Sequence, residues 1–325
     1  MIDRLQSVLG TGCDPHENLA IEQALLESTK AGCCTLYLWQ NRNTVVIGRN
    51  QNAWKECRTA LLEAEGGTLA RRLSGGGAVY HDLGNLNFTF LLPSEDYDLD
   101  RQLAVIQAAC ALCGVETERS GRNDLLADGR KFSGNAFYHH AGQSYHHGTL
   151  LVNVDRERMG RYLCPSEAKL NAKGVDSVRS RVVNLCELQP KLTVEQLKIA
   201  LLEAFGTVYG LPIEPVESNA IPMDRVRELT LRNRSWEWNY GQRLPFDFAC
   251  ERRFPWGEIR IEMQVENGIV RNAGVYTDAM DDLLAPTLKD TLTDCRFNAS
   301  ALCERVRAGV CLQTEDICNL LLQSM

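Results

Sequence analysis

The 325-residue sequence contains no run of about 18 apolar residues, the length that a membrane-spanning helix requires. It also lacks an excess of positive charge. Its 35 Lys and Arg residues stand against 42 Asp and Glu, a net charge of −7, whereas nucleic-acid-binding proteins are usually basic. No signal-peptide pattern opens the sequence. We therefore expect a soluble, cytoplasmic protein that binds neither nucleic acid nor a membrane.

A disulfide framework and a zinc site are also not expected. The 13 cysteines are scattered along a long chain, which favours reduced thiols. Cys110 and Cys113 form a CxxC, but they lie in an apolar helical stretch and should pack as core residues. Histidines occur as adjacent pairs at 139–140 and 146–147, and neighbours on a strand point to opposite faces. Each pair could therefore offer at most one ligand to a metal.

The familiar glycine-rich nucleotide loops are missing as well, because no GxxxxGKS occurs and no GxGxxG runs from a strand into a helix. The chain has instead RRLSGGGAVYHD at residues 71–82. Three glycines without Cβ atoms let backbone N–H groups approach an anion closely. The two arginines before them supply donor forks that suit phosphate or carboxylate. Strand-like residues follow, so this corner is either an anion-binding loop or only a tight hairpin.

A second polar cluster reads GRNDLLADGRKFSGNA at residues 121–136. Its Asp-Gly step at 128–129 predicts a hairpin turn. Asp124 then precedes the first strand, and Lys131 begins the second. On the residues alone, Lys131 is either a ligand-binding lysine or a solvated lysine of a turn. Small residues that leave room beside this lysine are Ser133, Gly134 and Ala136.

Hydrophobic periodicity predicts an α+β fold in two parts. In the first part we expect helices near 18–29, 99–113, 155–162, 193–209 and 222–232, and strands at 35–39, 44–47, 78–80, 86–92, 125–126, 131–133 and 148–154. Residues 241–257 suggest a connector. Beyond it, a half-buried strand at 259–265 turns back at Asn267-Gly268, and helices follow near 281–290, 298–307 and 314–323. Trp39, Trp236 and Trp238 are expected to pack in the core or between the domains.

Taken together, these motifs strongly resemble those of bacterial lipoate–protein ligases, of the biotin/lipoate ligase superfamily. The motifs that carry the resemblance lie at residues 71–82, 84–85, 120–124, 130–134 and 146–151, with further similar segments at 14–20, 44–49, 54–57, 173–182 and 235–241. The resemblance covers essentially the whole chain. It implies a large mixed-sheet catalytic domain at 1–244, a connector at 245–251 and a small C-terminal α+β accessory domain at 252–325.

The resemblance also implies the chemistry. Such enzymes join lipoate, or octanoate, to ATP as an acyl-AMP with release of pyrophosphate. They then pass the acyl group to a lysine of a carrier domain. The expected carriers are the lipoyl domains of 2-oxoacid dehydrogenase E2 subunits and the glycine cleavage H protein. The small domain is expected to help close the site and to swing aside for the carrier, and we expect a monomer.

Residue roles follow from the same resemblance. Lys131 is the expected catalytic residue, bridging the lipoyl carbonyl and the α-phosphate. Asp124 is the expected Mg²⁺ ligand, or it orients the incoming amine. Expected ATP or adenylate contacts are Arg71, Arg72, Ser74, Gly75, Gly76, Gly77, Ala78, Val79, Tyr80, Asn123, Asp124 and Lys131. Expected lipoate contacts are Gly76, His81, Lys131 and His147.

Three alternatives stay open. An acyltransferase of the same fold would use preformed lipoyl-adenylate, or a thioester donor that requires a nucleophilic cysteine near the lysine. Cys164 is the one candidate in that part of the chain. A biotin ligase would share the fold but has a differently ordered arginine- and glycine-rich loop. From another class, the chain could be an inactive lipoate-binding or regulatory protein.

Overall fold

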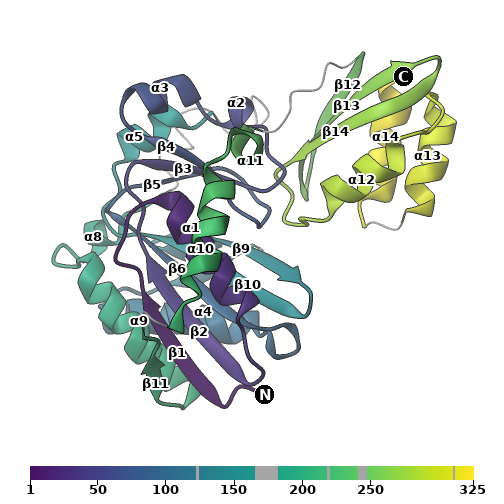
Figure 1. The fold of residues 1–325 in the computed structure, drawn as a ribbon. Helices are drawn as coiled ribbons and strands as arrows, with labels where there is room; N and C mark the ends of the chain where they lie inside the picture. The colour runs from purple at the N-terminus through teal and green to yellow at the C-terminus, as the bar shows by residue number, and fades with distance from the viewer. Residues whose placement is uncertain (122–123, 165–181, 218–219, 241–246, 310–311) are drawn as a thin grey trace.

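The computed structural model describes residues 1–121, 124–164, 182–217, 220–240, 247–309 and 312–325. The expected nucleotide contact Asn123 and the motif segment 173–181 lie outside the described residues. Two bodies are visible in Figure 1: a large α+β domain, and a small domain that contains the C-terminus.

A mixed sheet of eight strands forms the centre of the large domain in the described residues. Its strands are β1 (Arg4–Leu9), β2 (Cys33–Trp39), β6 (Asn85–Pro93), β7 (Glu118–Ser120), β8 (Asp124–Ala127), β9 (Arg130–His140), β10 (Gln143–Leu151) and β11 (Ile213–Pro215). They lie in the order β11-β1-β2-β6-β10-β9-β8-β7. β11, β1 and β2 run parallel, and every later neighbour runs antiparallel. The two edge strands are the shortest, at three residues each.

Helices cover both faces of this sheet. α1 (Pro15–Glu27) and α10 (Met223–Arg234) cross one face side by side, as Figure 1 shows. Asp14 caps α1 by accepting from the backbone N–H of His16 at 2.9 Å. α4 (Leu99–Leu112) and α9 (Val194–Tyr209) pack together on the other face. Short elements complete the domain: η1 (Ser94–Asp96), α2 (Ala53–Glu56), α3 (Thr59–Ala64), α5 (Arg156–Tyr162), α8 (Leu185–Leu188) and α11 (Trp236–Tyr240).

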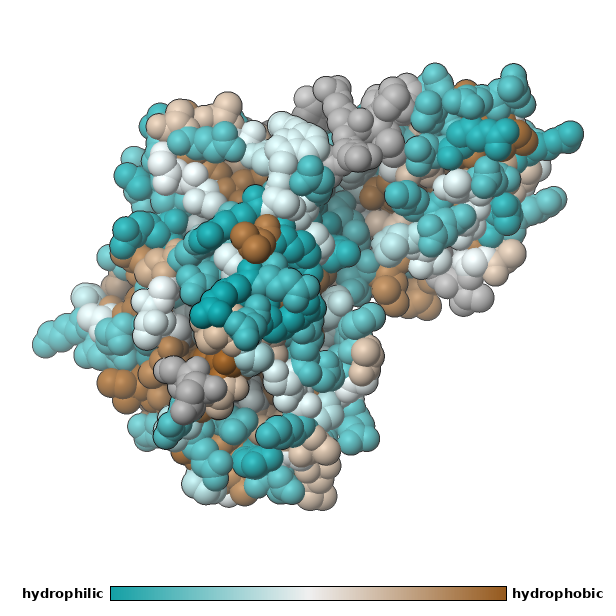
Figure 2. Space-filling view, viewed as in Figure 1, coloured by the Kyte–Doolittle hydropathy of each residue, from teal (hydrophilic) through white to brown (hydrophobic). Residues whose placement is uncertain are grey.

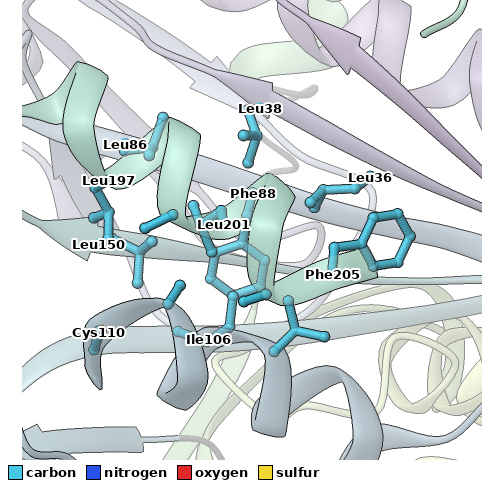
Figure 3. Close-up of a cluster of buried hydrophobic side chains, with 14 of the residues drawn as sticks. Leu36, Leu38, Leu86, Phe88, Ile106, Cys110, Leu150, Leu197, Leu201 and Phe205 are labelled. Atoms are coloured by element: carbon cyan, nitrogen blue, oxygen red, sulfur yellow. The ribbon is translucent and has the colours of Figure 1, made fainter. Parts of the chain in front are cut away.

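Strand alternation divides the interior into two parts. Leu36 and Leu38 of β2 point toward α4 and α9, into the main core drawn in Figure 3. Tyr37 and Trp39 of the same strand point the other way, into a cluster with Leu19 of α1. The α1 side is the more polar of the two, because it also receives polar side chains from β6 and β10.

A second, smaller sheet holds the glycine-rich segment. β4 (Thr68–Arg71) pairs in parallel with β3 (Thr44–Ile47), and β5 (Val79–His81) pairs antiparallel with β3. The segment 72–78 therefore connects two strands that flank β3, and it forms the strand-to-strand corner predicted from the sequence. No helix follows it, which distinguishes it from the standard nucleotide loops.

The predicted hairpin at 128–129 is present between β8 and β9. Asp128 has φ 52° and Gly129 has φ 67°, the left-handed conformations that a tight type I′ turn requires. A bulge lies between Leu125 and Leu126 of β8, just before the turn, and shifts the register between β8 and β9. Beyond it, β9 and β10 form a much longer hairpin than the sequence predicted, turning at Ala141 and Gly142.

The small domain packs three helices on a three-stranded sheet. The strands are β12 (Phe248–Phe254), β13 (Gly257–Glu266) and β14 (Ile269–Thr277), and the helices are α12 (Leu284–Leu292), α13 (Ala299–Ala308) and α14 (Thr314–Ser324). β12 pairs with β13 along its whole length. The small domain thus includes Phe248, so the expected boundary at residue 252 falls inside one of its strands. The turn at 255–256 joins β12 to β13 and is not part of a connector.

The surface is mostly polar. Figure 2 shows hydrophilic residues over most of the visible face, with hydrophobic residues in small separate groups. Within the described part of the chain, no helix combines the length and apolarity needed to cross a bilayer.

Candidate active site

A pocket of about 260 Å³ lies between the small sheet and the α1-facing side of the large sheet. One wall is the glycine-rich segment, and the opposite wall comes from β9 and β10. The lining residues are Leu19, Trp39, Val46, Arg72, Gly76, Gly77, Ala78, Val79, His81, Asn87, Lys131, Gly134, Asn135, Ala136, His147, Gly148, Thr149 and Met280. Both polar clusters singled out in the sequence therefore meet in one cavity.

Arg72 holds the shape of the glycine-rich segment from inside. Its guanidinium donates to the carbonyl oxygens of Gly75 at 2.7 Å and Gly77 at 2.8 Å, and to Ser74 Oγ at 3.0 Å. Gly76 adopts φ +87°, which a residue with a Cβ rarely does. Burial lowers the pKa of Arg72 to about 10, so it remains charged at neutral pH. A permanent cation thus borders the pocket.

Arg71 has a different environment, although it was expected to contact the nucleotide too. Its guanidinium donates to five backbone carbonyls: Gly48 at 3.1 Å, Arg49 at 2.9 Å, Gln51 at 2.7 Å, Trp238 at 2.8 Å and Asn239 at 2.6 Å. The side chain does not line the pocket. These hydrogen bonds connect the end of β4 to the loop that follows β3 and to α11. We therefore assign Arg71 a structural role.

Lys131 stands at the more open side of the pocket, where its side chain is 36% exposed. Its Nζ lies 2.6 Å from Asp124 Oδ1, across the β8–β9 hairpin. A Cβ on Gly134 would come within 3.0 Å of Nζ, so only glycine leaves the lysine its present space. Of the small residues predicted to leave room for a ligand, Gly134 adjoins the lysine and Ala136 lines the pocket, whereas the buried Ser133 is not among the lining residues. The compact ammonium group of a lysine that is paired with a carboxylate can move to pair with an incoming anion.

Strand alternation separates the residues of β5. Val79 and His81 line the pocket, whereas the Tyr80 ring packs away from it and donates its hydroxyl to Asn43 Oδ1 at 3.1 Å. An adenylate contact at residue 80 would therefore involve its backbone. Of the other expected nucleotide contacts, Gly76, Gly77 and Ala78 line the pocket, and Ser74 and Gly75 lie just behind it.

His81 is a neutral donor beside the pocket. Asn41 Nδ2 lies 3.1 Å from His81 Nδ1 and must donate to it, so Nε2 carries the ring proton. Burial lowers the pKa of His81 to about 3. Its Nε2 has no hydrogen-bond partner among the described residues, and neither has Nδ2 of the neighbouring lining residue Asn87. Buried donors of this kind suit a site that receives a ligand or water.

His147 lies at the buried end of the pocket. Its Nδ1 is 2.8 Å from Glu22 Oε1 on α1, and its Nε2 is 2.8 Å from Ser74 Oγ in the glycine-rich segment. Trp39 forms the wall beside it. Trp39 was expected only to pack in the core, and it does so with one face of its side chain while lining the pocket.

The small domain reaches this pocket. The Gly76 N–H donates to the carbonyl oxygen of Ala279 at 3.1 Å, and Met280 lines the cavity. Asn50 fastens the same segment by donating to the Asp282 carbonyl at 3.0 Å. One of the loop N–H groups expected to meet phosphate is thus paired with the small domain in this arrangement.

Cys164, the candidate nucleophile, follows α5 and does not line the pocket. Its backbone N–H donates to the Glu56 carbonyl at 2.9 Å, which places it beside the α2 segment. Among the residues that the structure describes, no three His, Cys, Asp or Glu side chains gather as metal ligands. Asp124 is the carboxylate beside Lys131, and one carboxylate fits a Mg²⁺ ion whose other ligands are phosphate oxygens and water.

Several residues of the pocket lining were not identified from the sequence, among them Asn87, Asn135, Thr149 and Met280, and neither was Glu22, which contacts His147. A usable signal was present for Asn87. This residue stands between Leu86 and Phe88 in β6, and a buried polar residue of this kind often faces a site. Nothing local distinguishes Met280, because its place depends on how the small domain packs.

Comparison with known proteins identifies the family to which the chain belongs. The family model "Lipoyl protein ligase A/B catalytic domain" matches residues 14–206, and "Bacterial lipoate protein ligase C-terminus" matches 244–319. A crystal structure of P. falciparum LipL1 in complex with lipoate is similar over 98% of this chain and 99% of that one, at 26% identity and a TM-score of 0.87.

Two other solved structures cover mainly the large domain. A lipoate-protein ligase A bound with ATP matches 74% of this chain and 99% of its own, at 25% identity and a TM-score of 0.63. A bi-partite ligase from Thermoplasma acidophilum, studied with its E2 lipoyl domain, matches 76% of this chain and 100% of its own, at 26% identity and a TM-score of 0.65. With both of its domains matched by family models, the chain belongs to the lipoate–protein ligase family.

Proposed function

We propose that this protein is an ATP-dependent lipoate–protein ligase. In the first step a carboxylate oxygen of lipoate, or of octanoate, attacks the α-phosphorus of ATP, and pyrophosphate leaves. In the second step a carrier lysine amine attacks the acyl carbon of lipoyl-AMP, AMP leaves, and the amine loses a proton. The observation that carries the proposal is the shared pocket, in which Lys131 faces the glycine-rich segment across a cavity with a buried, partly apolar end.

Lys131 is the proposed catalytic residue. Its Nζ would leave Asp124 to bridge the acyl oxygen and the α-phosphate, which reduces the repulsion between two anions that must meet. Arg72 would add a fixed positive potential, and the N–H groups of Gly77 and Ala78 would donate to phosphate. Removing one well-placed donor of this kind typically lowers a rate by about 100- to 1000-fold.

The acyl chain would extend from Lys131 toward Trp39 and His147. These two residues are buried, at 2% and 7% exposure, whereas Lys131 is partly exposed at the other side of the cavity. We therefore expect the carboxylate of the ligand to lie near the lysine and its apolar tail to lie at the buried end of the cavity. Two of the four expected lipoate contacts, His81 and His147, adjoin that course.

ATP would arrive with Mg²⁺, which neutralises the triphosphate, and Asp124 is the proposed protein ligand because one carboxylate suffices beside phosphate oxygens. The Gly76 N–H becomes available to phosphate only when the Ala279 carbonyl departs. We therefore propose that the small domain moves between nucleotide binding and acyl transfer. The proposed acceptors are the lipoyl domains of E2 subunits and the H protein, served by a cytoplasmic monomer.

The first test is pyrophosphate release from ATP and Mg²⁺, with and without lipoate, before any carrier is added. Wild-type protein should release pyrophosphate only with lipoate present. Lys131→Ala should lose at least about 100-fold of that rate while keeping the wild-type melting temperature, because the side chain borders the cavity and not the core. Lys30→Ala, which removes an exposed lysine, serves as the matched control and should behave as wild type.

The alternatives give different results in the same assay. Wild-type protein that releases no pyrophosphate, yet transfers lipoyl from chemically prepared lipoyl-AMP to a lipoyl domain, would be an acyltransferase. Binding of lipoate with neither reaction would indicate an inactive lipoate-binding protein. The position of Cys164 outside the pocket lining gives the thioester route no support.

A further inference from the structure

A chain of buried hydrogen bonds joins the two halves of the pocket. It begins at Trp39 Nε1, which donates to Thr89 Oγ1 at 3.1 Å, and continues from Thr89 Oγ1 to Glu22 Oε1 at 2.7 Å. His147 Nδ1 lies 2.8 Å from the same carboxylate oxygen. From His147 Nε2 the chain runs 2.8 Å to Ser74 Oγ, and Arg72 Nε donates to that oxygen at 3.0 Å.

The fold dictates that these groups meet. Thr89 of β6 is paired with Tyr37 of β2 on one side and His147 of β10 on the other. Trp39 is two residues beyond Tyr37, so alternation places it on the same face of the sheet. Glu22 faces them from α1. Ser74 reaches His147 from the glycine-rich segment, and every member of the chain is at most 7% exposed.

The donors have a consistent direction. Glu22 can only accept, so His147 Nδ1 carries a proton and donates to it. The Ser74 hydroxyl oxygen accepts a hydrogen bond from the Arg72 N–H, and its O–H can donate a hydrogen bond to His147 Nε2. Arg72 and Glu22 are thereby a buried cation and anion connected through one serine and one histidine. Such a network has few alternative arrangements, because each unpaired member would be a buried polar group without compensation.

The two ends of this chain touch different parts of the pocket. Trp39 and His147 line the buried end, where the acyl chain is proposed to lie. Arg72 grips the carbonyls of Gly75 and Gly77, so its position sets which way the loop N–H groups point. Within this hydrogen-bond network, Ser74 is the residue of the glycine-rich segment that contacts His147.

We propose that Ser74 is a positioning residue that couples acyl binding to the shape of the glycine-rich segment. An acyl chain packed against His147 and Trp39 favours this arrangement of the network over one in which His147 turns away from Ser74, and this arrangement orders the loop that receives the nucleotide. Lipoate should therefore increase the affinity for the nucleotide, and the nucleotide should increase the affinity for lipoate by the same factor, because coupling is reciprocal. This inference rests on the proposed function, since it assigns the two halves of the pocket to the two substrates.

The test uses isothermal titration of the full-length protein with lipoate and α,β-methylene-ATP, a pair that binds but cannot release pyrophosphate. In wild type, saturating lipoate should lower the dissociation constant of the nucleotide analogue by about 5-fold or more. In Ser74→Ala, lipoate should bind with nearly its wild-type dissociation constant, whereas the coupling factor should fall to about one. His147→Gln, whose amide can still donate to Glu22, should lose coupling in the same way.

Ser144→Ala is the matched control. Ser144 is fully buried and its Oγ lies 2.7 Å from His139 Nδ1, on the same hairpin but outside the pocket lining. It should keep the wild-type coupling factor. A folded Ser74→Ala protein that retains wild-type coupling would overturn the inference. So would a wild-type coupling factor of one in a protein that releases pyrophosphate with lipoate, and that result would leave the proposed function intact.

Discussion

Arg71 and Arg72 are adjacent in the chain, yet their guanidinium groups organise different parts of the molecule. Arg72 points into the curve of the glycine-rich segment, whereas Arg71 points away from it into carbonyls of the β3–α2 loop and α11. Neighbours at a strand end point to opposite sides. The pair therefore provides one cation for the pocket and one internal tie.

At the residue scale, Gly48 should tolerate substitution less well than Gly77. A Cβ on Gly48 would lie 2.2 Å from the Gly76 carbonyl oxygen, whereas a Cβ on Gly77 meets nothing within 4 Å. Gly48→Ala must displace the glycine-rich backbone, and we expect a loss of about 1–3 kcal/mol in unfolding free energy. Gly77→Ala should stay within about 0.5 kcal/mol. Urea denaturation measures both, and equal stabilities would contradict the contact.

Two buried histidines should make the protein sensitive to acid. Burial lowers the pKa of His81 and of His146 to about 3, whereas an unfolded histidine has a pKa near 6.5. Between those values the unfolded chain binds protons that the folded chain does not, so stability falls as pH decreases below about 6.5. Each histidine contributes about 1.4 kcal/mol per pH unit in that window.

Histidine C2 proton resonances, followed by NMR from pH 7 to pH 4, test this directly. The ring signals of His81 and His146 should keep their neutral chemical shift at pH 5. Protonation of both buried rings near pH 6.5 would show that they are accessible to solvent and would remove the expected acid sensitivity.

The site was predictable to the level of motifs but not of individual contacts. Lys131 and the glycine-rich segment could be identified because they belong to motifs that resemble those of the ligase family, whereas glycine and lysine by themselves are ordinary residues of a turn. The structural role of Arg71 could not be predicted, because Arg71 and Arg72 have the same side chain and differ only in the direction in which the backbone points it. Glu22 carried no local signal either, because its partner His147 is 125 positions away in the sequence.

At the scale of elements, Arg71 should act as a clamp for α11. Replacing it with Ala leaves five buried or part-buried carbonyls without their donor, and each lost partner costs up to about 1–3 kcal/mol before water compensates. We expect Arg71→Ala to lower the unfolding free energy by at least about 3 kcal/mol. Arg119→Ala, which removes an exposed pair with Asp100, should cost less than about 1 kcal/mol.

Thermal denaturation followed by circular dichroism would compare the two variants. An Arg71→Ala protein as stable as Arg119→Ala would show that α11 does not depend on the clamp. A second signal is local: Trp238 Nε1 donates to the Arg71 carbonyl at 3.0 Å, so tryptophan fluorescence should change when the loop is released.

Long elements were predicted well because their periodicity reports burial on one face. The helices at 99–113 and 193–209 and the hairpin at Asn267-Gly268 are examples. The short strands β4, β7 and β11 were not predicted, since three or four residues are too few to show a period. The longer strands β1 and β12 were not predicted either. The length of β9 was also missed. Lys131 and Asn135 line the pocket together with Gly134 and Ala136, so polar and small residues interrupt the alternation of apolar side chains that would have indicated a longer strand.

At the scale of the whole molecule, the two domains have separate hydrophobic cores. Phe88 belongs to the core between the large sheet and α4 and α9, while Leu302 belongs to the core of the small domain. Leu302→Ala should destabilise the small domain by about 2–5 kcal/mol and leave the large domain's transition unchanged. Phe88→Ala should do the reverse.

Differential scanning calorimetry would resolve this as two transitions, of which one moves in each variant. A single transition that shifts equally in both variants would mean that the domains unfold together. In that case the contacts between Lys55 and the carboxylates of Glu251 and Glu258, both at 2.9 Å, would be strong enough to unite them.

The large sheet ends, on both sides, in strands of three residues. β7 is exposed along its length and carries Glu118 and Arg119, and β11 ends in Pro215, whose nitrogen has no proton to offer. Edge strands that are short, charged or ended by proline offer few backbone groups for pairing with a strand of another protein. These edge strands therefore protect the sheet against pairing with a strand of another protein. Extended chains cannot easily join the sheet and seed amyloid-like fibres.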